Sequence, residues 1–325
     1  MGDSSETTTD PARIAILIVS DYAGGEEKSW NDLRLALKAW RDQLEEFDSL
    51  SRSAFTWWLV ESSRLVPLVP GDLFELLPGL RLLSVEAESS YALKNAGVEA
   101  TQADWVALVD ADCVPAPGWL RRLQAAIAAD PGLAAVSGIT TYPGRNRLER
   151  FFGLLDRSYA IPARSGPGYF ISGNAAAYRT NLYLRYPLTL DLGPFAGRMQ
   201  SEAMIRDGLR FHVDLAMRTV HDFEGWRMER DIRRQHGFAT VITRLRDRRM
   251  PQSWLVRLGP MAIPAIVLGK TLLTLADAWR CHALYGVRGV ELPLALLLCP
   301  LLHVLEIPGM VLAYSGRQLS DTAYR

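Results

Sequence analysis

Cysteine is scarce in this chain of 325 residues, and the three that occur, Cys113, Cys281 and Cys299, are far apart. This scarcity excludes a disulfide framework and a zinc site of closely spaced cysteines, so we expect the main domain to lie in a reducing compartment. Net charge is also absent, because 36 basic side chains balance 36 acidic ones. A neutral chain gives no indication of a nucleic-acid partner, and none is expected.

The chain also lacks an internal repeat and an apolar N-terminal run. Residues 1–11 are polar and rich in Ser, Thr and Asp. This composition predicts a disordered tail rather than a signal peptide or a membrane anchor.

Short apolar runs alternate with amphipathic stretches over the first 140 residues. The runs predict strands at 13–20, 55–60, 80–85, 105–109 and 133–138. The stretches between them predict helices at 29–47, 91–100 and 119–129. This alternation indicates an α/β fold with a mostly parallel, doubly wound sheet, which binds ligands at the carboxyl ends of its strands. The segment 145–168 mixes helix with a Gly- and Pro-containing loop, where substrate-specific structure is usually inserted.

Acidic residues stand at the ends of two predicted strands. Glu61 follows FTWWLV, and Asp110 and Asp112 end the stretch WVALVDADCVP. Carboxylates in apolar surroundings are costly to ionise unless a cation or hydrogen-bond donors meet them, so they indicate a metal or phosphate site. The alternative for the Asp pair is a polar turn before Pro115.

Two long apolar segments follow residue 257. The first, 258–276, is interrupted only by Lys270, and the second, 292–314, only by His303 and Glu306. Each is long enough to cross a bilayer, and basic residues flank the outer ends of the pair, which places both ends in the cytoplasm. The alternative is a hairpin that lies in the membrane interface, since five prolines interrupt it. In a crossing hairpin the depths of Lys270 and Glu306 differ by only about 6 Å, which predicts that they pair.

The motifs occur in a recognisable order. They are VESS at 60–63, YALKNAGVEAT at 91–101 and DWVALVDADCVPAPGWL at 104–120. Together they resemble the family 2 glycosyltransferases, which have the nucleotide-diphospho-sugar (GT-A) fold, and the resemblance covers about residues 13–240. It implies a GT-A catalytic domain at 12–250, followed by the membrane hairpin at 251–325. The implied reaction is inverting transfer of a single sugar from a nucleotide-diphospho-sugar, with Mg²⁺ or Mn²⁺ bound.

The resemblance also implies roles for the residues of the donor half. Asp112 would bind the metal, and Asp110 would bind the ribose or reach the metal through water. Glu61 stands where the family usually has an Asp in the base and ribose pocket. Lys94 would lean toward the phosphates, with a solvated helix lysine as the alternative. Three further residues are expected around the bound donor: Asn95, Gly173 and Asn174. Of these, Asn95 is expected to shape its turn more than to touch the ligand.

The acceptor half departs further from the family pattern. Glu202, at the start of a helix expected over 201–207, is the expected general base, and Asp191 is its substitute. The alternative is a helix-terminal acid that favours the macrodipole. His221 would approach the metal or the phosphates, unless it is structural. Arg233, Arg234 and Gln235 stand where processive synthases carry Gln-x-x-Arg-Trp, and the absence of that motif favours single-sugar transfer.

Two other functions compete with this interpretation. The Asp-x-Asp stretch also fits the nucleophile loop of haloacid-dehalogenase-type phosphatases, but these need a later lysine, and only Lys270 follows Asp112. The second alternative is a catalytically degenerate, membrane-bound scaffold on the same fold. The hairpin indicates a cell-membrane protein whose catalytic domain faces the cytoplasm, with a lipid-linked or glycan acceptor, although anchoring alone would explain the hairpin equally well.

Overall fold

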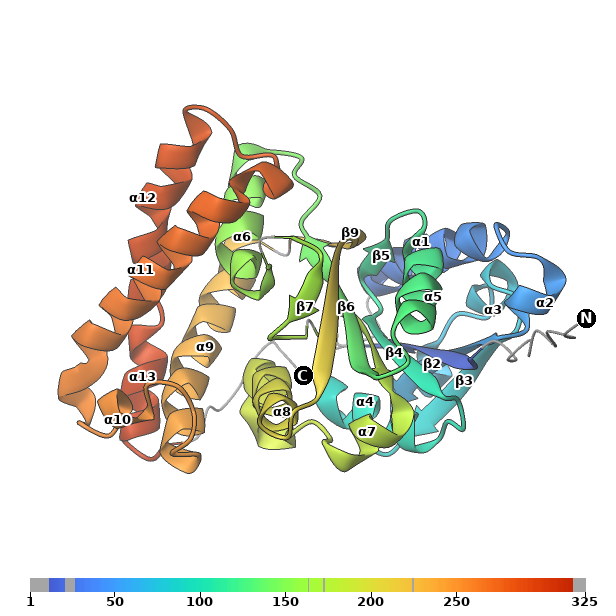
Figure 1. Cartoon of the computed structure of the whole chain (residues 1–325), viewed down its shortest axis with the longest axis horizontal. Coiled ribbons are helices and arrows are strands. Elements are labelled where there is room, and N and C mark those ends of the chain that lie inside the picture. Colours follow the sequence, from blue (N-terminus) through green and yellow to red (C-terminus); the bar gives the residue numbers. More distant parts are fainter. Residues whose placement is uncertain (1–11, 21–26, 163, 172, 224, 318–325) are drawn as a thin grey trace, which may run out of the picture.

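The computed structural model describes residues 12–20, 27–162, 164–171, 173–223 and 225–317. The predicted tail at 1–11 lies outside them. A twisted sheet with helices on both faces forms one side of the molecule, and a group of long helices from the C-terminal part forms the other (Figure 1).

The sheet has nine strands: β1 (Ile14–Val19), β2 (Phe55–Ser62), β3 (Leu80–Val85), β4 (Trp105–Asp110), β5 (Cys113–Pro115), β6 (Leu133–Thr141), β7 (Gly166–Gly168), β8 (Ala175–Arg179) and β9 (Arg210–His221). Their order is β3-β2-β1-β4-β8-β6-β9-β5, with β7 beside β9. The first four are parallel, as predicted, whereas β8 is antiparallel to both β4 and β6. The sheet is therefore mixed, and its parallel half carries the predicted strand-end site.

Strand β1 lies in the middle of the parallel half and is buried on both faces, which explains its uninterrupted apolar sequence. Ile14, Ile16 and Ile18 pack toward α1 (Glu27–Leu44) and α5 (Trp119–Ala129). The alternate residues pack toward α4 (Ser90–Glu99) and α7 (Thr180–Arg185). Two hydrophobic layers thus hold the carboxyl ends of β1, β2 and β4 in fixed register.

The other helices are α2 (Ser49–Arg52), α3 (Leu73–Leu76), α6 (Arg147–Arg157), α8 (Ala196–Arg206), α9 (Trp226–Arg246), α10 (Ser253–Val256), α11 (Ile263–Cys281), α12 (Glu291–Val304) and α13 (Ile307–Tyr314). One predicted boundary is wrong, because α8 begins at Ala196 rather than at Ser201. Gly193, in a left-handed conformation with φ of 50°, turns the chain just before this helix. The first turn contains Ala196 and Gly197, whose small side chains gave no apolar periodicity to reveal it.

The C-terminal apolar segments are helical, as predicted. By length and composition, Pro260–Tyr285 and Glu291–Tyr314 could each cross a membrane. The second is divided at Leu305 and Glu306 into α12 and α13. Pro308, in the first turn of α13, has no N–H with which to continue the hydrogen bonds of α12. The predicted pair is confirmed, since the Lys270 ammonium contacts the Glu306 carboxylate.

Helix α13 packs against α9 at backbone distance. A Cβ added to Gly237 in α9 would lie 1.9 Å from the carbonyl oxygen of Glu306, and one added to Gly309 would lie equally close to that of Arg234. We therefore expect Gly237→Ala to separate the two helices and to lower the free energy of unfolding by about 1–3 kcal/mol. Thermal unfolding in detergent measures this loss.

Gly269→Ala in α11 is the matched control, because a Cβ there would meet nothing within 4 Å. Alanine is the better helix former, so this variant should be as stable as the wild type or slightly more so. Equal stability of the two variants would show that α9 and α13 are not in tight contact.

Candidate functional site

Four residues meet at the carboxyl end of β4. The Asp110 carboxylate is 2.5 Å from the Lys94 ammonium, which also donates a hydrogen bond of 3.1 Å to the carbonyl oxygen of Gly173. The Asn174 amide donates to the other oxygen of Asp110 at 2.7 Å. Lys94 is only 5% exposed, which excludes the alternative of a solvated helix lysine. The structure thus brings together four of the residues predicted from the sequence.

The position of Lys94 follows from how closely α4 approaches the sheet. Ser89 caps the helix by accepting a hydrogen bond from the Ala92 amide. A Cβ on Gly97 would lie 3.0 Å from the Leu17 side chain and 3.1 Å from that of Val60, so glycine permits this close packing. The long Lys94 side chain can then reach the end of β4.

Asn95 turns away from this cluster. Its amide nitrogen donates to the carbonyl oxygen of Leu188, and its oxygen accepts from the Tyr183 hydroxyl and the Leu188 amide. These bonds fix the 183–188 segment. Within the described chain, Asn95 therefore shapes the local structure and does not line the cleft described below.

Asp112 and His221 face each other beside the cluster, because β5 pairs with β9 so that Cys113 lies opposite His221. The imidazole Nε2 is 3.0 Å from an Asp112 oxygen. The Nδ1 atom is 2.6 Å from the carbonyl oxygen of Asp222 and can donate a hydrogen bond to it. In the neutral ring, this bond puts the lone pair on Nε2, on the side of Asp112. Histidine metal ligands typically have their other ring nitrogen hydrogen-bonded in this way.

The donor atoms at this place fit a divalent cation. Asp112, Cys113 and His221 each offer a ligand atom, and these atoms lie within 4.8 Å of one another. A carboxylate oxygen and an imidazole nitrogen suit Mn²⁺, and the carboxylate also suits Mg²⁺. Asp112 and His221 were predicted as ligands, whereas Cys113 was not.

Asp32 of α1 extends the acidic surroundings of this pair and was not found from the sequence. One of its carboxylate oxygens is buried and has no hydrogen-bond partner among the described residues. Burial raises the pKa of Asp32, Lys28 opposes the shift, and the negative charges of Asp222 and Asp112 raise the pKa further. A cation bound near Asp112 would therefore also favour the ionised form of Asp32.

Glu61 is fully buried at the end of β2, and it accepts a hydrogen bond of 2.7 Å from the Ser62 amide. Val19 of β1 lies opposite both Val60 and Asp110, so the ends of β2 and β4 flank the end of β1. The acids of β2 and β4 thus lie at one sheet edge, as predicted. Glu61 itself is not among the residues that line the cleft.

A cleft of about 110 Å³ opens in front of Asp110, Lys94 and Asn174. Its opposite wall comes from the end of α6 and from α9, which lie on the side of the sheet that faces the C-terminal helices (Figure 1). The residues of that wall are Asp156, Arg157, Tyr159, Ile232 and His236. The sequence marked the 145–168 segment as substrate-specific, but none of these residues belongs to a motif that would have identified it.

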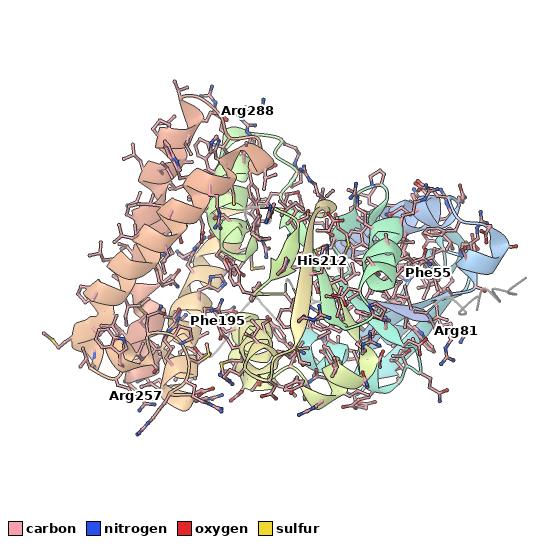
Figure 2. All side chains as sticks on the ribbon, viewed as in Figure 1. Phe55, Arg81, Phe195, His212, Arg257 and Arg288 are labelled. Atoms are coloured by element: carbon pink, nitrogen blue, oxygen red, sulfur yellow. The ribbon has the colours of Figure 1, made fainter. Side chains whose placement is uncertain are left out.

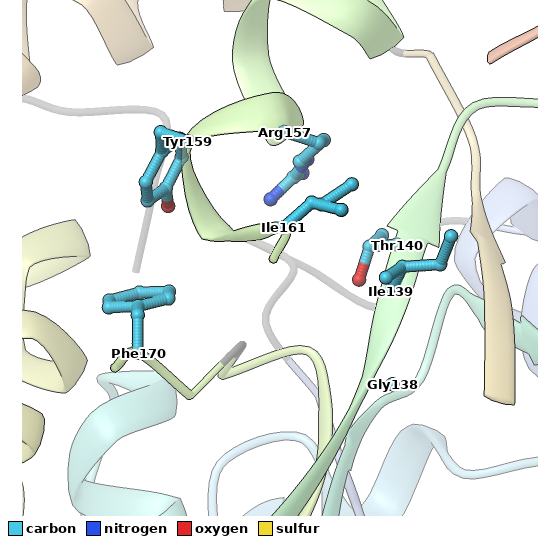
Figure 3. Close-up of a pocket in the computed structure, with 7 residues that line it drawn as sticks. All are labelled: Gly138, Ile139, Thr140, Arg157, Tyr159, Ile161 and Phe170. Atoms are coloured by element: carbon cyan, nitrogen blue, oxygen red, sulfur yellow. The ribbon is translucent and has the colours of Figure 1, made fainter. Parts of the chain in front are cut away.

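A smaller pocket of about 20 Å³ adjoins the cleft and shares Arg157, Tyr159 and Phe170 with it. Figure 3 shows the Arg157 guanidinium directed into this pocket, with Tyr159 and Phe170 on one side and Ile139 and Thr140 on the other. The guanidinium also donates to the Asn174 side-chain oxygen at 3.3 Å. A cationic side chain therefore links the aromatic pocket to the Asp110 cluster.

The two acids expected on the acceptor side lie elsewhere. Glu202 is the seventh residue of α8, not near its start, and forms an ion pair with Arg198. Asp191 is exposed and pairs with Arg246 at 2.6 Å. Neither lines the cleft, whereas Gly197 at the start of α8 does. The misplaced helix boundary explains why Glu202 seemed to stand at a helix start, and its role as the base stays a prediction.

His236 of the cleft wall gives the fold a specific pH dependence. Burial, together with the nearby positive charge of Arg233, lowers its pKa to about 3. In the unfolded chain the imidazole takes up a proton below its ordinary pKa of 6.5, whereas the folded protein keeps it neutral. Stability is therefore lost as the pH falls below that value, by about 2 kcal/mol between pH 7 and pH 5. Thermal unfolding at both pH values should show a smaller loss for His236→Gln, and equal losses would contradict this assignment.

Residues 84–186 match the sequence model of glycosyl transferase family 2. This matched segment, the family 2 segment, contains Lys94, Asp110, Asp112 and Asn174. The sequence match therefore coincides with the site that the geometry identifies.

Two relatives extend the comparison. The glycosyltransferase AglE of Haloferax volcanii is 30% identical over 125 residues, which are 37% of this chain and 38% of AglE. The mannosyltransferase PcManGT of Pyrobaculum calidifontis, solved with GDP-Man and Mn²⁺, superposes with a TM-score of 0.57 at 16% identity. That superposition covers 94% of this chain and 88% of PcManGT, and it confirms the predicted GT-A fold.

Proposed function

We propose that this protein is an inverting glycosyltransferase that moves a single sugar from a nucleotide-diphospho-sugar to an acceptor at a membrane, with a divalent metal bound. One observation carries the proposal. Two groups of side chains lie together at the carboxyl edge of the sheet: the buried cluster of Lys94, Asp110 and Asn174, and the facing pair of Asp112 and His221. All of them lie within the family 2 segment except His221, which lies beside it in the fold. In α/β sheets, that edge is where ligands bind.

The site contains groups that suit a leaving nucleotide diphosphate. Asp112 and His221 would hold Mg²⁺ or Mn²⁺, which neutralises charge on the diphosphate when bound. Lys94 offers a second positive charge, and Asp110 and Gly173 orient its ammonium. Asn174 fixes the other Asp110 oxygen, so the carboxylate is already oriented before a donor ribose binds. Glu61 would bind at the nucleoside end of the same donor.

An inverting transfer needs a base for the acceptor hydroxyl. By its position in the family pattern, Glu202 is the proposed base, and Asp191 is its substitute. Glu202 would have to leave its ion pair with Arg198 to reach the cleft.

The C-terminal helices support a place at the membrane, with a lipid-linked or glycan acceptor. Only 28% and 39% of the two apolar windows are buried inside the protein. Figure 2 shows Arg257 and Arg288 at opposite ends of this helical group. Between them the exposed apolar side chains include Leu268, Leu272, Leu273, Leu294, Leu297 and Leu301. The loop end of this helical group contacts the catalytic domain, because Glu291 pairs with Arg150 of α6 at 2.6 Å. This contact supports the alternative of a hairpin that lies in the membrane interface, with the Arg-rich stretch at 244–257 and the catalytic domain on the cytoplasmic side.

A transfer assay tests this proposal. Full-length protein in liposomes is incubated with Mn²⁺, with labelled UDP-, GDP- or dTDP-sugars, and with a total lipid extract or soluble oligosaccharides. We expect label from one donor to enter one acceptor fraction, and Glu202→Gln to reduce this transfer without loss of donor binding if Glu202 is the base. Donor binding with no transfer to any fraction would favour a binding or scaffold protein on the same fold.

A further inference from the structure

A buried network of charges joins the C-terminal helices to α9. Glu306, fully buried between α12 and α13, contacts the Lys270 ammonium of α11. Its carboxylate is 3.0 Å from Nδ1 of His303 and 3.6 Å from the guanidinium of Arg233 in α9. Lys270 also donates to the Thr240 hydroxyl of α9 at 3.2 Å. Side chains from α9, α11 and α12 thus converge on one carboxylate.

The network continues to the wall of the cleft. The Arg233 guanidinium forms ion pairs with Glu229, at 2.5 Å, and with Asp156 at the end of α6. Asp156 lines the cleft opposite the Asp110 cluster and accepts a hydrogen bond from the Tyr142 hydroxyl. The side chains of Arg233 and Asp156 are 4% and 9% exposed. Charges buried this deeply are costly without their partners, so each contact constrains the next.

Helix α9 is the element shared by the two sides. Ile232 and His236 line the cleft, whereas Arg233 contacts Glu306, and Gly237 lets α9 approach the Glu306 backbone. The Arg233 guanidinium is planar and its donors have a fixed geometry, so the position of one bound carboxylate constrains the position of the others. A shift of Glu306 would therefore displace Arg233, and with it Asp156.

We propose that Asp156 binds a hydroxyl group of the acceptor, and that Glu306 is a positioning residue that acts on Asp156 through Arg233. The C-terminal helices then form part of the acceptor site and do not serve only as an anchor. This inference rests on the proposed glycosyl transfer, because it assigns the acceptor side of the same cleft.

The test compares two glutamines in the C-terminal helices. Glu306→Gln weakens the network, whereas Glu291→Gln, the matched control, breaks the ion pair of 2.6 Å between α12 and Arg150 of α6, outside the network. Both variants are assayed in liposomes, with the acceptor fraction that receives label from the wild-type protein. We expect Glu306→Gln to lower kcat/KM for that acceptor by about tenfold to a hundredfold. In Glu306→Gln, the stabilisation of the fold by nucleotide sugar and Mn²⁺ should stay within about twofold of the wild type. In Glu291→Gln, both this stabilisation and kcat/KM for the acceptor should stay within about twofold.

Two outcomes would overturn the inference. One is an unchanged acceptor kcat/KM in Glu306→Gln, and the other is an equal loss of donor binding and acceptor use, which indicates general damage to the fold. If Glu306→Gln does not fold, Lys270→Met and Asp156→Asn are measured instead, and the same selective loss on the acceptor side is required of both. A wild-type protein that no nucleotide sugar stabilises would contradict the proposed function itself.

Discussion

Asp112→Asn is expected to lower the rate of sugar transfer by about a thousandfold while the protein stays folded. The substitution keeps the size of the side chain but removes the charge that would hold the metal opposite His221. Loss of metal assistance to a leaving diphosphate removes several kcal/mol of transition-state stabilisation, and about 4 kcal/mol corresponds to a thousandfold. Initial rates at a series of Mn²⁺ concentrations measure the effect, and excess Mn²⁺ should restore little of the lost rate.

Asp104→Asn is the matched control for this variant. Asp104 stands just before β4, at the opposite end of the strand, where its exposed carboxylate accepts a hydrogen bond from the Arg13 amide. Its replacement should leave the transfer rate within about twofold of the wild type, because surface ion pairs contribute little to stability. Comparable rates for the Asp112 and Asp104 variants would show that Asp112 holds no catalytic metal.

Lys94→Met is expected to reduce both stability and donor binding. The variant leaves the Asp110 carboxylate buried without its ammonium partner at 2.5 Å, and removal of one member of a buried ion pair costs about 3–5 kcal/mol. The double variant Lys94→Met/Asp110→Asn removes both charges and should recover most of the lost stability. It should not recover donor binding, since Lys94 and Asp110 are both assigned to the donor. Denaturant unfolding and nucleotide-sugar binding separate the two effects.

Lys38→Met provides the comparison for Lys94→Met, because Lys38 is an exposed lysine of α1. Surface substitutions of this kind change stability by no more than about 0.5 kcal/mol. If the double variant is no more stable than Lys94→Met, the lost stability comes from packing and not from the unpaired Asp110 charge.

The donor side of the cleft could be predicted from the sequence because local signals define it. Buried strands end where an apolar run ends, so the positions of Glu61, Asp110 and Asp112 follow from the runs themselves. The roles of Lys94 and Asn174 could then be predicted from the resemblance to the family motifs alone. Tertiary structure added the antiparallel strand β8, which places Asn174 beside Asp110 by main-chain pairing.

The acceptor side could not be predicted in the same way. Asp156, Arg157 and His236 reach the cleft because α6 and α9 pack beside the sheet, and no short-range pattern in the sequence encodes that packing. The start of α8 was misplaced because its first turn has little apolar periodicity, and the expected role of Glu202 depended on that boundary. The Lys270 and Glu306 pair was predictable from depth alone, but its continuation through Arg233 was not.

The central claim is that Asp110 and Asp112 belong to a site for a nucleotide-diphospho-sugar and a divalent metal. Thermal unfolding of the full chain in detergent, with UDP-, GDP- and dTDP-sugars and with or without Mn²⁺, tests it directly. One class of nucleotide sugar should raise the Tm of the wild-type protein, mainly when Mn²⁺ is present, and should fail to do so for Asp112→Asn. If no nucleotide sugar raises the Tm, or if Asp112→Asn responds as the wild type does, the claim is contradicted.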